Sequence, residues 1–479
     1  MKPQPATPSF NLTLLGSLYG AEFALLLIAL ALYKLDDRPI DAWFPSGASI
    51  ALLAGVALLL VAVALISRAY MKRAATGPHG FSFTVAMNLI SLALILIPFE
   101  VALRFMTRDS PDAPMFGDSA LLPRSWERAV AHYGQQLARE DGTIRAYLVY
   151  DETLGWTVGP SRTSRDGVHF SSAEGVRAAT PGVTLPRTTD KVRIAIVGDS
   201  FAFAEHVKFE EPFGHLLDEA LGTDVEVLNF GVPGYGVDQS YLKLRKEVLG
   251  WKPDIVVLGF PMHDFYRSMT VYPFINWQSW NMPFSKARFV WEQGELRAVN
   301  LPTVRPDKMF AMPSISDLPH LQHDEGYRAG DWRISAWDLS YVKRWLTRQF
   351  PRWSDMPARF GEAEILRLNT EILKQFVRTA EENDMVPLLV FFPLMPELEL
   401  SARGSETRSQ RSLKGLNMQV LDTTPCLLDA GTVDNAYLPG DPHYSALGNA
   451  AVAKCIRSAL EPVLKDLKPA NRPAARQQS

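Results

Sequence analysis

The sequence has little cysteine and little net charge. Its 479 residues include only Cys426 and Cys455, and neither has a partner at the short spacing typical of zinc or iron–sulfur ligands. The formal net charge is −3, which gives no strong field for attracting nucleic acid. We therefore expect no metal, no cofactor and no nucleic-acid partner. In an oxidising compartment the two cysteines could form a disulfide, and two separate buried thiols are the alternative.

Long apolar stretches are confined to the first part of the chain. They lie at about Phe10–Leu35, Ser49–Ile66 and Phe81–Phe105, and each has close to the ~20 apolar residues that a helix needs to cross a bilayer. The first carries Glu22, a carboxylate that is costly in lipid unless it faces another helix or the interface. No small-residue cleavage site follows soon after it, which argues against a signal peptide. Residues 1–107 are therefore predicted to be a membrane anchor with three transmembrane helices.

The charges of the connecting loops give the predicted orientation. The loop after the second stretch carries Arg68, Lys72 and Arg73 and no acid, whereas the loop after the first is rich in aspartate. By the positive-inside rule the basic loop and the N-terminus are cytoplasmic. Three crossings then place everything after Thr107 on the other side. We expect a three-pass protein of a bacterial inner membrane whose main domain lies in the periplasm.

From Lys191 onward, short apolar runs alternate with helical stretches. The runs are VRIAIVG, VEVLNFG, DIVVLGF, PLLVFFP and MQVLDTT. Continuous apolar strands that alternate with helices are typical of a parallel sheet covered on both faces. Residues 191–462 are therefore predicted to be an α/β domain. A connector over 108–190, with a helix near Ser125–Arg139 and short strands, precedes it, and 463–479 are predicted to be a disordered tail.

A long insertion, from about 266 to 358, interrupts this alternation. It contains a predicted hairpin that turns at Gln293 and Gly294, and it also contains His320 and His323, which we expect to be loop residues rather than metal ligands. Seven of the eleven tryptophans lie in it: Trp277, Trp280, Trp291, Trp332, Trp337, Trp345 and Trp353. These rings either form a small core of the insertion's own or line an aromatic groove or lid beside a site.

Residues that could take part in catalysis follow the predicted strands at their carboxyl ends. Open parallel sheets form their active sites at these ends. These residues are Ser200 after the first strand, Gly231 after the second, His263 after the third, and Asp441 and His443 before the last helix. A serine hydroxyl becomes a nucleophile when an imidazole takes its proton, and a carboxylate holds that imidazole in the right tautomer. Backbone N–H groups at Ser200 and Gly231 would stabilise the oxyanion.

Each of these residues also has a structural interpretation. Ser200, in Gly-Asp-Ser, could cap a helix. His443 could cap the last helix or bind a carbonyl, and Asp441 could form the turn before Pro442. His206 is expected at the surface.

The pattern resembles the SGNH hydrolases, also called GDSL esterases, over roughly Lys191–Leu460 with the insertion set aside. The segments that carry the resemblance are IVGDSF, VLNFGVPGYG and GDPHYSALGN, in the order and strand contexts of the family. The resemblance implies a flavodoxin-like three-layer α/β/α fold. It also implies that Ser200 is the nucleophile, that His443 is the general base oriented by Asp441, and that Gly231 donates to the oxyanion hole.

Two positions depart from the common pattern of the family. Asp441 stands two residues before His443 rather than three, as in branches that include periplasmic O-acetyltransferases of exopolysaccharides. His263 stands where the family has an asparagine, so that it either replaces this oxyanion donor or has a structural role.

The resemblance and the predicted location together imply a membrane-anchored, extracytoplasmic serine esterase. Its substrate would be a glycan or small molecule that carries a small acyl group such as acetyl. One alternative is a polysaccharide O-acyltransferase with the same acyl-enzyme, which would need a membrane partner to donate the acyl group. The other is a non-catalytic SGNH-like module that binds glycan or scaffolds an envelope complex.

Overall fold

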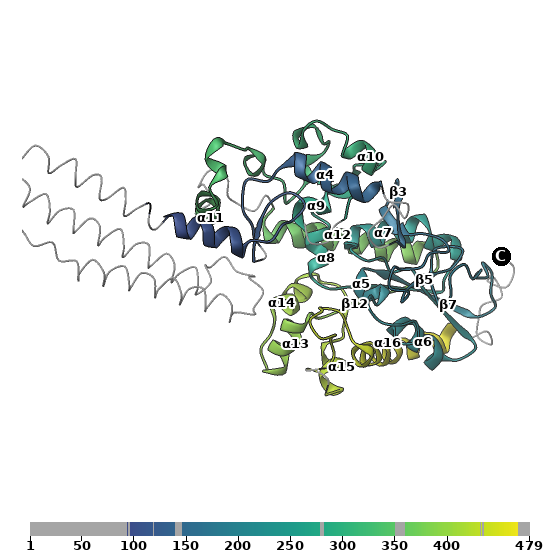
Figure 1. Cartoon of the computed structure of the whole chain (residues 1–479). Coiled ribbons are helices and arrows are strands. Elements are labelled where there is room, and N and C mark those ends of the chain that lie inside the picture. Colours follow the sequence, from purple (N-terminus) through teal and green to yellow (C-terminus); the bar gives the residue numbers. More distant parts are fainter. Residues whose placement is uncertain are drawn as a thin grey trace, which may run out of the picture. The chain divides into compact units, whose positions relative to one another are not determined.

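The computed structural model describes the greater part of the chain after the predicted membrane spans (Figure 1). The described residues are 93, 96–117, 119–138, 146–277, 282–349, 360–431, 433 and 435–467. The first two predicted spans, the basic loop at 68–73 and most of the third span lie outside them. Within the described part, no helix is both long enough and apolar enough to cross a bilayer.

The chain divides into two compact units. The described residues within 1–125 and 330–356 form the first, which we call the small unit. Those within 126–329 and 357–479 form the second, the large unit. The predicted insertion at 266–358 is thus split between the two units.

The large unit is built on a parallel sheet of five strands. The strands are β7 (Val192–Gly198), β8 (Val225–Asn229), β9 (Ile255–Phe260), β12 (Val386–Phe391) and β13 (Leu421–Asp422). Their order in the sheet is β13-β12-β9-β7-β8, and every neighbouring pair is parallel. Numbered along the chain this is the order 2-1-3-4-5, which is the flavodoxin-like arrangement. The prediction of an α/β domain with a flavodoxin-like parallel sheet is confirmed.

Helices cover both faces of this sheet. Helices α7 (Val237–Lys246) and α12 (Glu362–Glu382) share a core cluster with Ala195 and Val197 of β7. Helices α6 (Phe213–Leu221) and α16 (Ala446–Leu467) share the other cluster with Ile194 and Ile196. Because neighbouring residues of a strand point to opposite faces, a strand buried on both sides must be apolar throughout. Figure 1 shows the resulting three layers, with α7 and α12 above the strands and α6 and α16 below them.

Helix α12 illustrates how the sequence pattern specifies this packing. Its apolar residues recur every three or four positions, and the buried ones include Ile365, Leu368, Ile372 and Phe376. This spacing places them on one face of the helix, which packs against the sheet. The helix runs from Glu362 to Glu382, within the predicted α/β domain.

The last helix corrects the predicted start of the tail. Helix α16 continues through Pro462 to Leu467, past the boundary predicted at residue 463. Leu464 is buried in the cluster of α6 and α16, and Val463 and Leu467 pack against it. These apolar contacts extend the helix, and the residues from 468 onward lie outside the described part.

Short elements before the sheet contribute to the core of the large unit. They are α4 (Trp126–Leu137), the hairpin β3 (Leu148–Asp151) with β4 (Gly155–Val158), and the pair β5 (Phe170–Ser171) and β6 (Arg177–Ala178). The Trp156 indole N–H donates to the carbonyl of Pro233, and the Tyr235 hydroxyl donates to the carbonyl of Trp156. These bonds fix the loop that follows β8.

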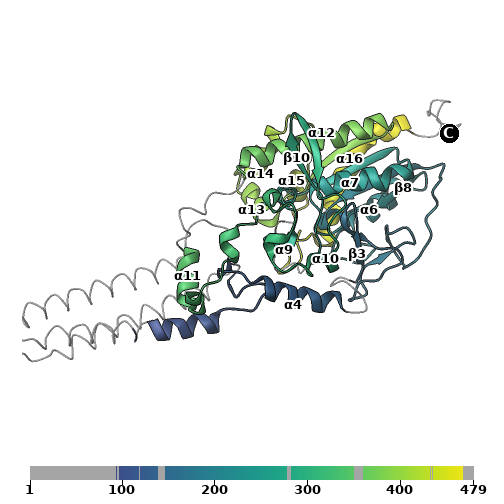
Figure 2. The ribbon, with the colours of Figure 1, turned by 90° about the horizontal axis from the view of Figure 1, so that it is seen from above.

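The insertion contributes a hairpin and short helices to the large unit. Strands β10 (Arg288–Glu292) and β11 (Glu295–Val299) turn at Gln293 and Gly294, both of which have positive φ, as the sequence predicts. The hairpin contacts α7 and α12 (Figure 2). The remaining α-helices of the described large unit are α5 (Ser200–Phe203), α8 (His263–Arg267), α9 (Pro273–Asn276), α10 (Pro306–Met309), α13 (Met395–Ala402), α14 (Arg408–Gly415) and α15 (Thr424–Asp429).

The tryptophans of the insertion do not gather in one core. Trp291 packs against the main core of the large unit, whereas Trp345 is buried in the small unit beside Phe99. Trp337 is exposed. Trp280 and Trp353 lie outside the described residues.

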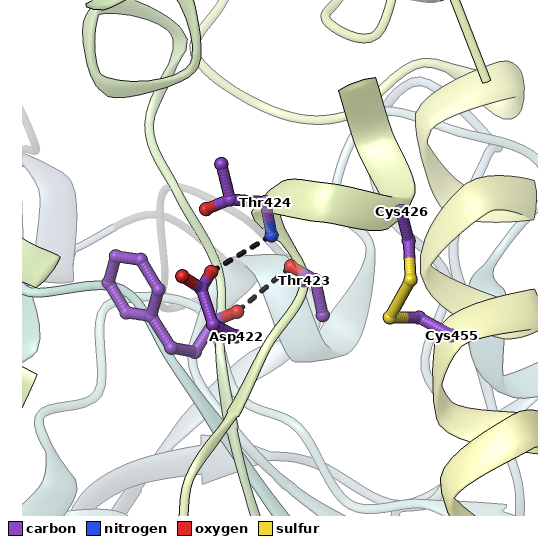
Figure 3. Close-up of a disulfide and its surroundings, with 6 residues drawn as sticks. Asp422, Thr423, Thr424, Cys426 and Cys455 are labelled. Carbon is purple, nitrogen blue, oxygen red and sulfur yellow. Dashed lines mark hydrogen bonds between the residues drawn. A yellow bond between two sulfur atoms is a disulfide. The ribbon is translucent and has the colours of Figure 1, made fainter. Parts of the chain in front are cut away.

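A disulfide joins Cys426 in α15 to Cys455 in α16 (Figure 3). Of the two alternatives that the sequence leaves open, the structure contains the bonded pair. The segment before α15 is held to the sheet, because the Thr423 hydroxyl donates to the Phe391 carbonyl, 2.9 Å away. The disulfide therefore connects the last strand of the sheet to the last helix.

Candidate active site

Gly-Asp-Ser forms a tight turn between β7 and α5, and the residue that caps the helix is Asp199. Its Oδ1 accepts the N–H of Phe201 at 2.8 Å. Gly198 adopts φ +152°, and a Cβ there would lie 2.3 Å from the carbonyl oxygen of Gly259. Glycine is therefore required at this turn. Because Asp199 takes the capping role, the hydroxyl of Ser200 is not needed for it.

Ser200, His443 and Asp441 are in hydrogen-bond contact. The Ser200 Oγ lies 2.8 Å from His443 Nε2. His443 Nδ1 lies 2.6 Å from Asp441 Oδ1. A carboxylate can only accept a hydrogen bond, so the proton of neutral His443 sits on Nδ1 and Nε2 accepts from the serine hydroxyl. The three residues have the geometry that proton transfer from the hydroxyl to the imidazole requires.

Asp441 is ionised at neutral pH. Burial raises the pKa of its carboxyl, but the hydrogen bonds from the ring and the backbone N–H of His443 outweigh this effect and hold the pKa at about 2. Both bonds end on Oδ1, and the backbone bond is 2.9 Å long. The Asp-x-His spacing thus lets one carboxylate oxygen hold both the backbone and the ring of the histidine.

Aromatic residues hold the loop that carries His443. The hydroxyl groups of Tyr437 and Tyr444 both donate to the carbonyl of Pro393, just after β12. The ring of Phe201 contacts the rings of both His443 and Tyr444, with centroid distances of 5.1 and 5.0 Å. The loop and the turn with Ser200 are therefore packed against each other through Phe201.

The structure does not support the oxyanion role predicted for Gly231. Its N–H donates to Asn229 Oδ1 at 2.9 Å. A Cβ on Gly231 would lie 2.5 Å from the backbone nitrogen of Phe203, so the glycine is needed for close packing against α5. The sequence indicates that a glycine follows β8. It does not show that the N–H of Gly231 is already hydrogen-bonded to the Asn229 side chain.

One backbone N–H group in the turn after β7 and one in the loop after β8 have no protein acceptor among the described residues. They belong to Ser200, at the start of α5, and to Gly234, in the loop after β8. Gly234 is half-buried and has φ +84°, a conformation that favours glycine. The loop after β8 thus offers Gly234, not Gly231, as a backbone donor.

The ring of His263 faces the carboxylates of Asp199 and Asp264 rather than a position that a substrate oxyanion could take. Its Nε2 lies 3.3 Å from Asp199 Oδ2 and 3.5 Å from Asp264 Oδ1. Burial and the nearby charge of Arg267 lower the pKa of His263 below that of free imidazole, despite the hydrogen bond to Asp199. A neutral imidazole has one N–H, and here it points to Asp199. This geometry favours the structural role among the two that the sequence leaves open.

Arg267 is a site residue that the sequence does not reveal. Its Nη1 donates to Asp199 Oδ2 at 2.9 Å, to Asp264 Oδ1 at 2.7 Å and to the carbonyl of Tyr235 at 3.2 Å. One buried guanidinium therefore joins the turn after β7, the loop after β8 and helix α8. The pair Asp264 and Arg267, three residues apart on a helix, is visible in the sequence. Their contact with Asp199 depends on the fold.

Glu205 and His206 lie beside the same residues. The buried carboxylate of Glu205 accepts from the Tyr147 hydroxyl at 2.8 Å, and its Oε2 lies 4.0 Å from His443 Nε2. His206 is exposed, as predicted, but its Nε2 lies only 3.6 Å from Asp441 Oδ2. The sequence gives no signal for Glu205 beyond its nearness to Ser200.

Among the described residues, two clusters have ligand atoms close enough together to hold a cation. One is His206, Asp441 and His443, and the other is Asp199, His263 and Asp264. In the first, both ring nitrogens of His443 already bond to Ser200 and Asp441. In the second, the Arg267 guanidinium already bonds to both carboxylates. In both clusters, atoms that could bind a cation already form hydrogen bonds within the protein.

No family model matches the sequence, and no curated protein matches it. Among solved structures, it is similar to a lipase/acylhydrolase from Enterococcus faecalis, with 15% identity over 57% of this chain and 96% of that one and a TM-score of 0.29. An acetylxylan esterase from Geobacillus stearothermophilus matches with 12% identity over 58% and 97%, at a TM-score of 0.30. A GDSL-like lipase from Bacteroides thetaiotaomicron matches with 10% identity over 58% and 93%, at 0.28.

The strand order and the position of the site residues in the chain describe the same arrangement. The sheet has the flavodoxin-like order, Ser200 follows its first strand along the chain, and Asp441 and His443 precede its last helix. The large unit thus has the flavodoxin-like α/β fold that the resemblance to the SGNH hydrolases implies.

Proposed function

We propose that the protein is a serine esterase that removes small acyl groups through an acyl-enzyme on Ser200. The observation that carries this proposal is the 2.8 Å contact between Ser200 Oγ and His443 Nε2, with His443 held by the ionised Asp441. An isolated serine hydroxyl is a poor nucleophile, and a base at hydrogen-bond distance makes it a competent one.

The reaction would proceed in two steps. Ser200 Oγ attacks the ester carbonyl while its proton passes to His443 Nε2, and the imidazolium then protonates the departing alcohol. In the second step His443 takes a proton from water, which attacks the carbonyl of the acyl-enzyme. The bond to Ser200 Oγ then breaks, the imidazolium returns its proton to that oxygen, and the acid is released. Asp441 stays ionised in both steps and stabilises the imidazolium.

The oxyanion of each tetrahedral intermediate needs preorganised donors. The N–H groups of Ser200 and Gly234 are the candidates, because they have no protein acceptor in the described residues. Such a donor typically contributes about 10²–10³ in turnover. Arg267 and His263 would act through Asp199 by fixing the turn from which the Ser200 N–H projects.

The substrate we propose is a glycan, or a small molecule, that carries an acyl group such as acetyl. The support is the expected position of the large unit outside the cytoplasm, on a membrane anchor formed by residues 1–107. The disulfide between Cys426 and Cys455 agrees with an oxidising compartment. A polysaccharide O-acyltransferase with a membrane acyl-donor partner is the second candidate, since a sugar hydroxyl could replace water in the second step.

A fluorophosphonate probe tests the proposal and separates it from a non-catalytic glycan-binding or scaffold module. We expect the probe to label the wild-type protein and to fail on Ser200→Ala. Ser405→Ala, at an exposed loop serine, is the matched control and should label normally. Equal labelling of the Ser200→Ala and wild-type proteins, or no labelling of either, would contradict a nucleophilic role for Ser200.

A further inference from the structure

The most exposed large apolar side chains of the described chain all belong to the small unit. They are Phe105 at 87%, Trp337 at 80%, Leu339 at 78%, Ile334 at 63% and Ile97 at 62%. In the described part of the large unit, no large apolar side chain is more than 48% exposed. Single exposed apolar residues are ordinary, but a concentration of this kind in one unit marks a contact surface.

The helix over residues 96–106 has two apolar faces. Phe99 and Leu103 pack against Trp345 of α11 (Tyr341–Gln349) in the core of the small unit. Ile97, Val101 and Phe105 are exposed. Residues four apart lie on the same face of a helix, so these three form a second apolar stripe. One face of the helix holds the small unit together, and the other has no protein cover in the described residues.

The segment with Trp337 and Leu339 is bound to the end of this helix. Arg104 donates from Nη2 to the carbonyl of Leu339, 2.7 Å away, and its guanidinium lies 4.4 Å from the centre of the Tyr341 ring. Glu100 accepts the backbone N–H groups of Tyr341 and Val342. The backbone beside Trp337 and Leu339 is therefore bonded to the helix that carries Phe105.

A polar frame holds the segment in this conformation. The buried Asp338 accepts from the N–H and hydroxyl of Ser335 at 2.7 and 2.6 Å, and it forms an ion pair with Lys343. The acid in the middle of the segment is thus turned inward. Its neighbours Trp337 and Leu339 project outward from a fixed backbone.

The exposed charges of the described small unit are mostly positive. Arg104, Arg108, Arg333 and Arg348 are exposed, against a single exposed acid, Asp109. Arginine beside exposed tryptophan and leucine is the combination found where proteins enter the interface of a bilayer, because guanidinium groups meet phosphates and indole rings sit at the headgroup level.

We propose that Phe105, Ile334, Trp337 and Leu339 form a membrane-contact patch that inserts into the boundary between headgroups and acyl chains. This rests on the proposed membrane anchor. The chain enters the described region at the helix over 96–106, after the predicted spans, and Phe105 is the last residue of the third predicted span. A segment fixed to that end of the helix lies at the depth where the chain leaves the bilayer.

The patch would give the small unit a second attachment to the membrane, in addition to the spans. A segment from far along the chain, residues 334–339, would then share the interface with the end of the anchor. The small unit would be held against the surface rather than hinged on a single helix end.

The test uses the full chain in lipid nanodiscs with one added cysteine labelled by an environment-sensitive fluorophore. Leu339→Cys reports on the patch, and Phe105→Cys reports on the anchor itself. Leu400→Cys, at an exposed position of α13, is the matched control. The native cysteines are bonded and do not react with the label. Since Leu339 is exposed, its replacement removes no core packing, and aryl acetate turnover checks that each variant is folded.

We expect lipids with a doxyl quencher near the headgroup to quench the label at 339 and at 105, with a blue shift of both, and to leave the label at 400 unchanged. Quenching at 105 with a water-exposed label at 339 would overturn the patch and leave the anchor standing. Labels at 105 and 339 that both behave like the control would refute the anchor as well. A label at 339 that is shielded from aqueous iodide but not quenched by lipid would mean that protein covers the surface, which also overturns the proposal.

Discussion

Asp441 Oδ1 accepts two hydrogen bonds from the same residue, one from the ring of His443 and one from its backbone N–H. The spacing of two residues makes this possible, because the side chain of an aspartate readily reaches the N–H two positions on. The acid therefore positions the histidine and keeps its own charge.

Replacing Asp441 by asparagine should lower turnover less than Ser200→Ala does, because the base remains but loses its orientation. The pKa of about 2 also predicts a pH dependence. A carboxyl with a pKa lowered by folding stabilises the protein above its unfolded pKa, and this contribution is lost as pH falls through the folded value. Asp441 is partly exposed, so we expect on the order of 1 kcal/mol after allowance for solvent screening.

The measurement is the difference in unfolding free energy between wild type and Asp441→Asn as a function of pH. It should be constant above about pH 5 and shrink between about pH 4 and 2. A difference that grows as the pH falls would contradict the assigned ionisation of Asp441.

His263 should contribute to catalysis only through Asp199. If it donated directly to the oxyanion, His263→Ala would lose about 10²–10³ in kcat and His263→Asn would recover much of it. Because its Nε2 faces Asp199, we expect a loss well below that range, with no advantage of asparagine over alanine. Steady-state kinetics of the two variants on an aryl acetate decide the matter. Rescue by asparagine would restore the donor role that the sequence suggests.

The disulfide should stabilise the segment that carries Asp441 and His443. Cys426 and Cys455 are separated by 29 residues, and closing a loop of this length is worth about 3–4 kcal/mol in the chain-entropy model. We expect urea unfolding of the Cys426→Ser/Cys455→Ser variant to show a loss of this order. Alkylation of both cysteines in unreduced protein from its native source would show that the bond does not form.

The topology that we propose is predicted by the basic loop with Arg68, Lys72 and Arg73. Alkaline phosphatase fused after Asp109 should be active, because it would be exported, and a fusion after Ala75 should be inactive. The opposite pattern would place the large unit in the cytoplasm and remove the argument for an envelope substrate.

The sequence predicts the elements that depend on local pattern. The apolar runs of β7 and β9 indicate a buried parallel sheet, the spacing in α12 indicates its packed face, and Gln293 with Gly294 indicates the hairpin turn. Ser200 can be recognised because it follows the first strand within the triplet Gly-Asp-Ser. Asp441 and His443 can be recognised because they lie two residues apart just before the last helix.

Contacts across the fold and the orientations of side chains cannot be predicted from the sequence. Arg267 bonds to Asp199 only because α8 lies beside the turn after β7, and Gly231 loses its free N–H only because the Asn229 side chain folds back. The extension of α16 to Leu467 likewise depends on the cluster into which Leu464 packs. Each of these is decided by neighbours that are distant in sequence or by a side-chain orientation.

The most direct test of the central claim is the turnover of a small aryl acetate by four proteins: wild type, Ser200→Ala, His443→Ala and the double variant. Since Ser200 and His443 act as a unit, either single change should abolish most of the turnover, and the double variant should be little worse than either. Wild-type turnover in the Ser200→Ala protein would contradict the assignment of Ser200 as the nucleophile.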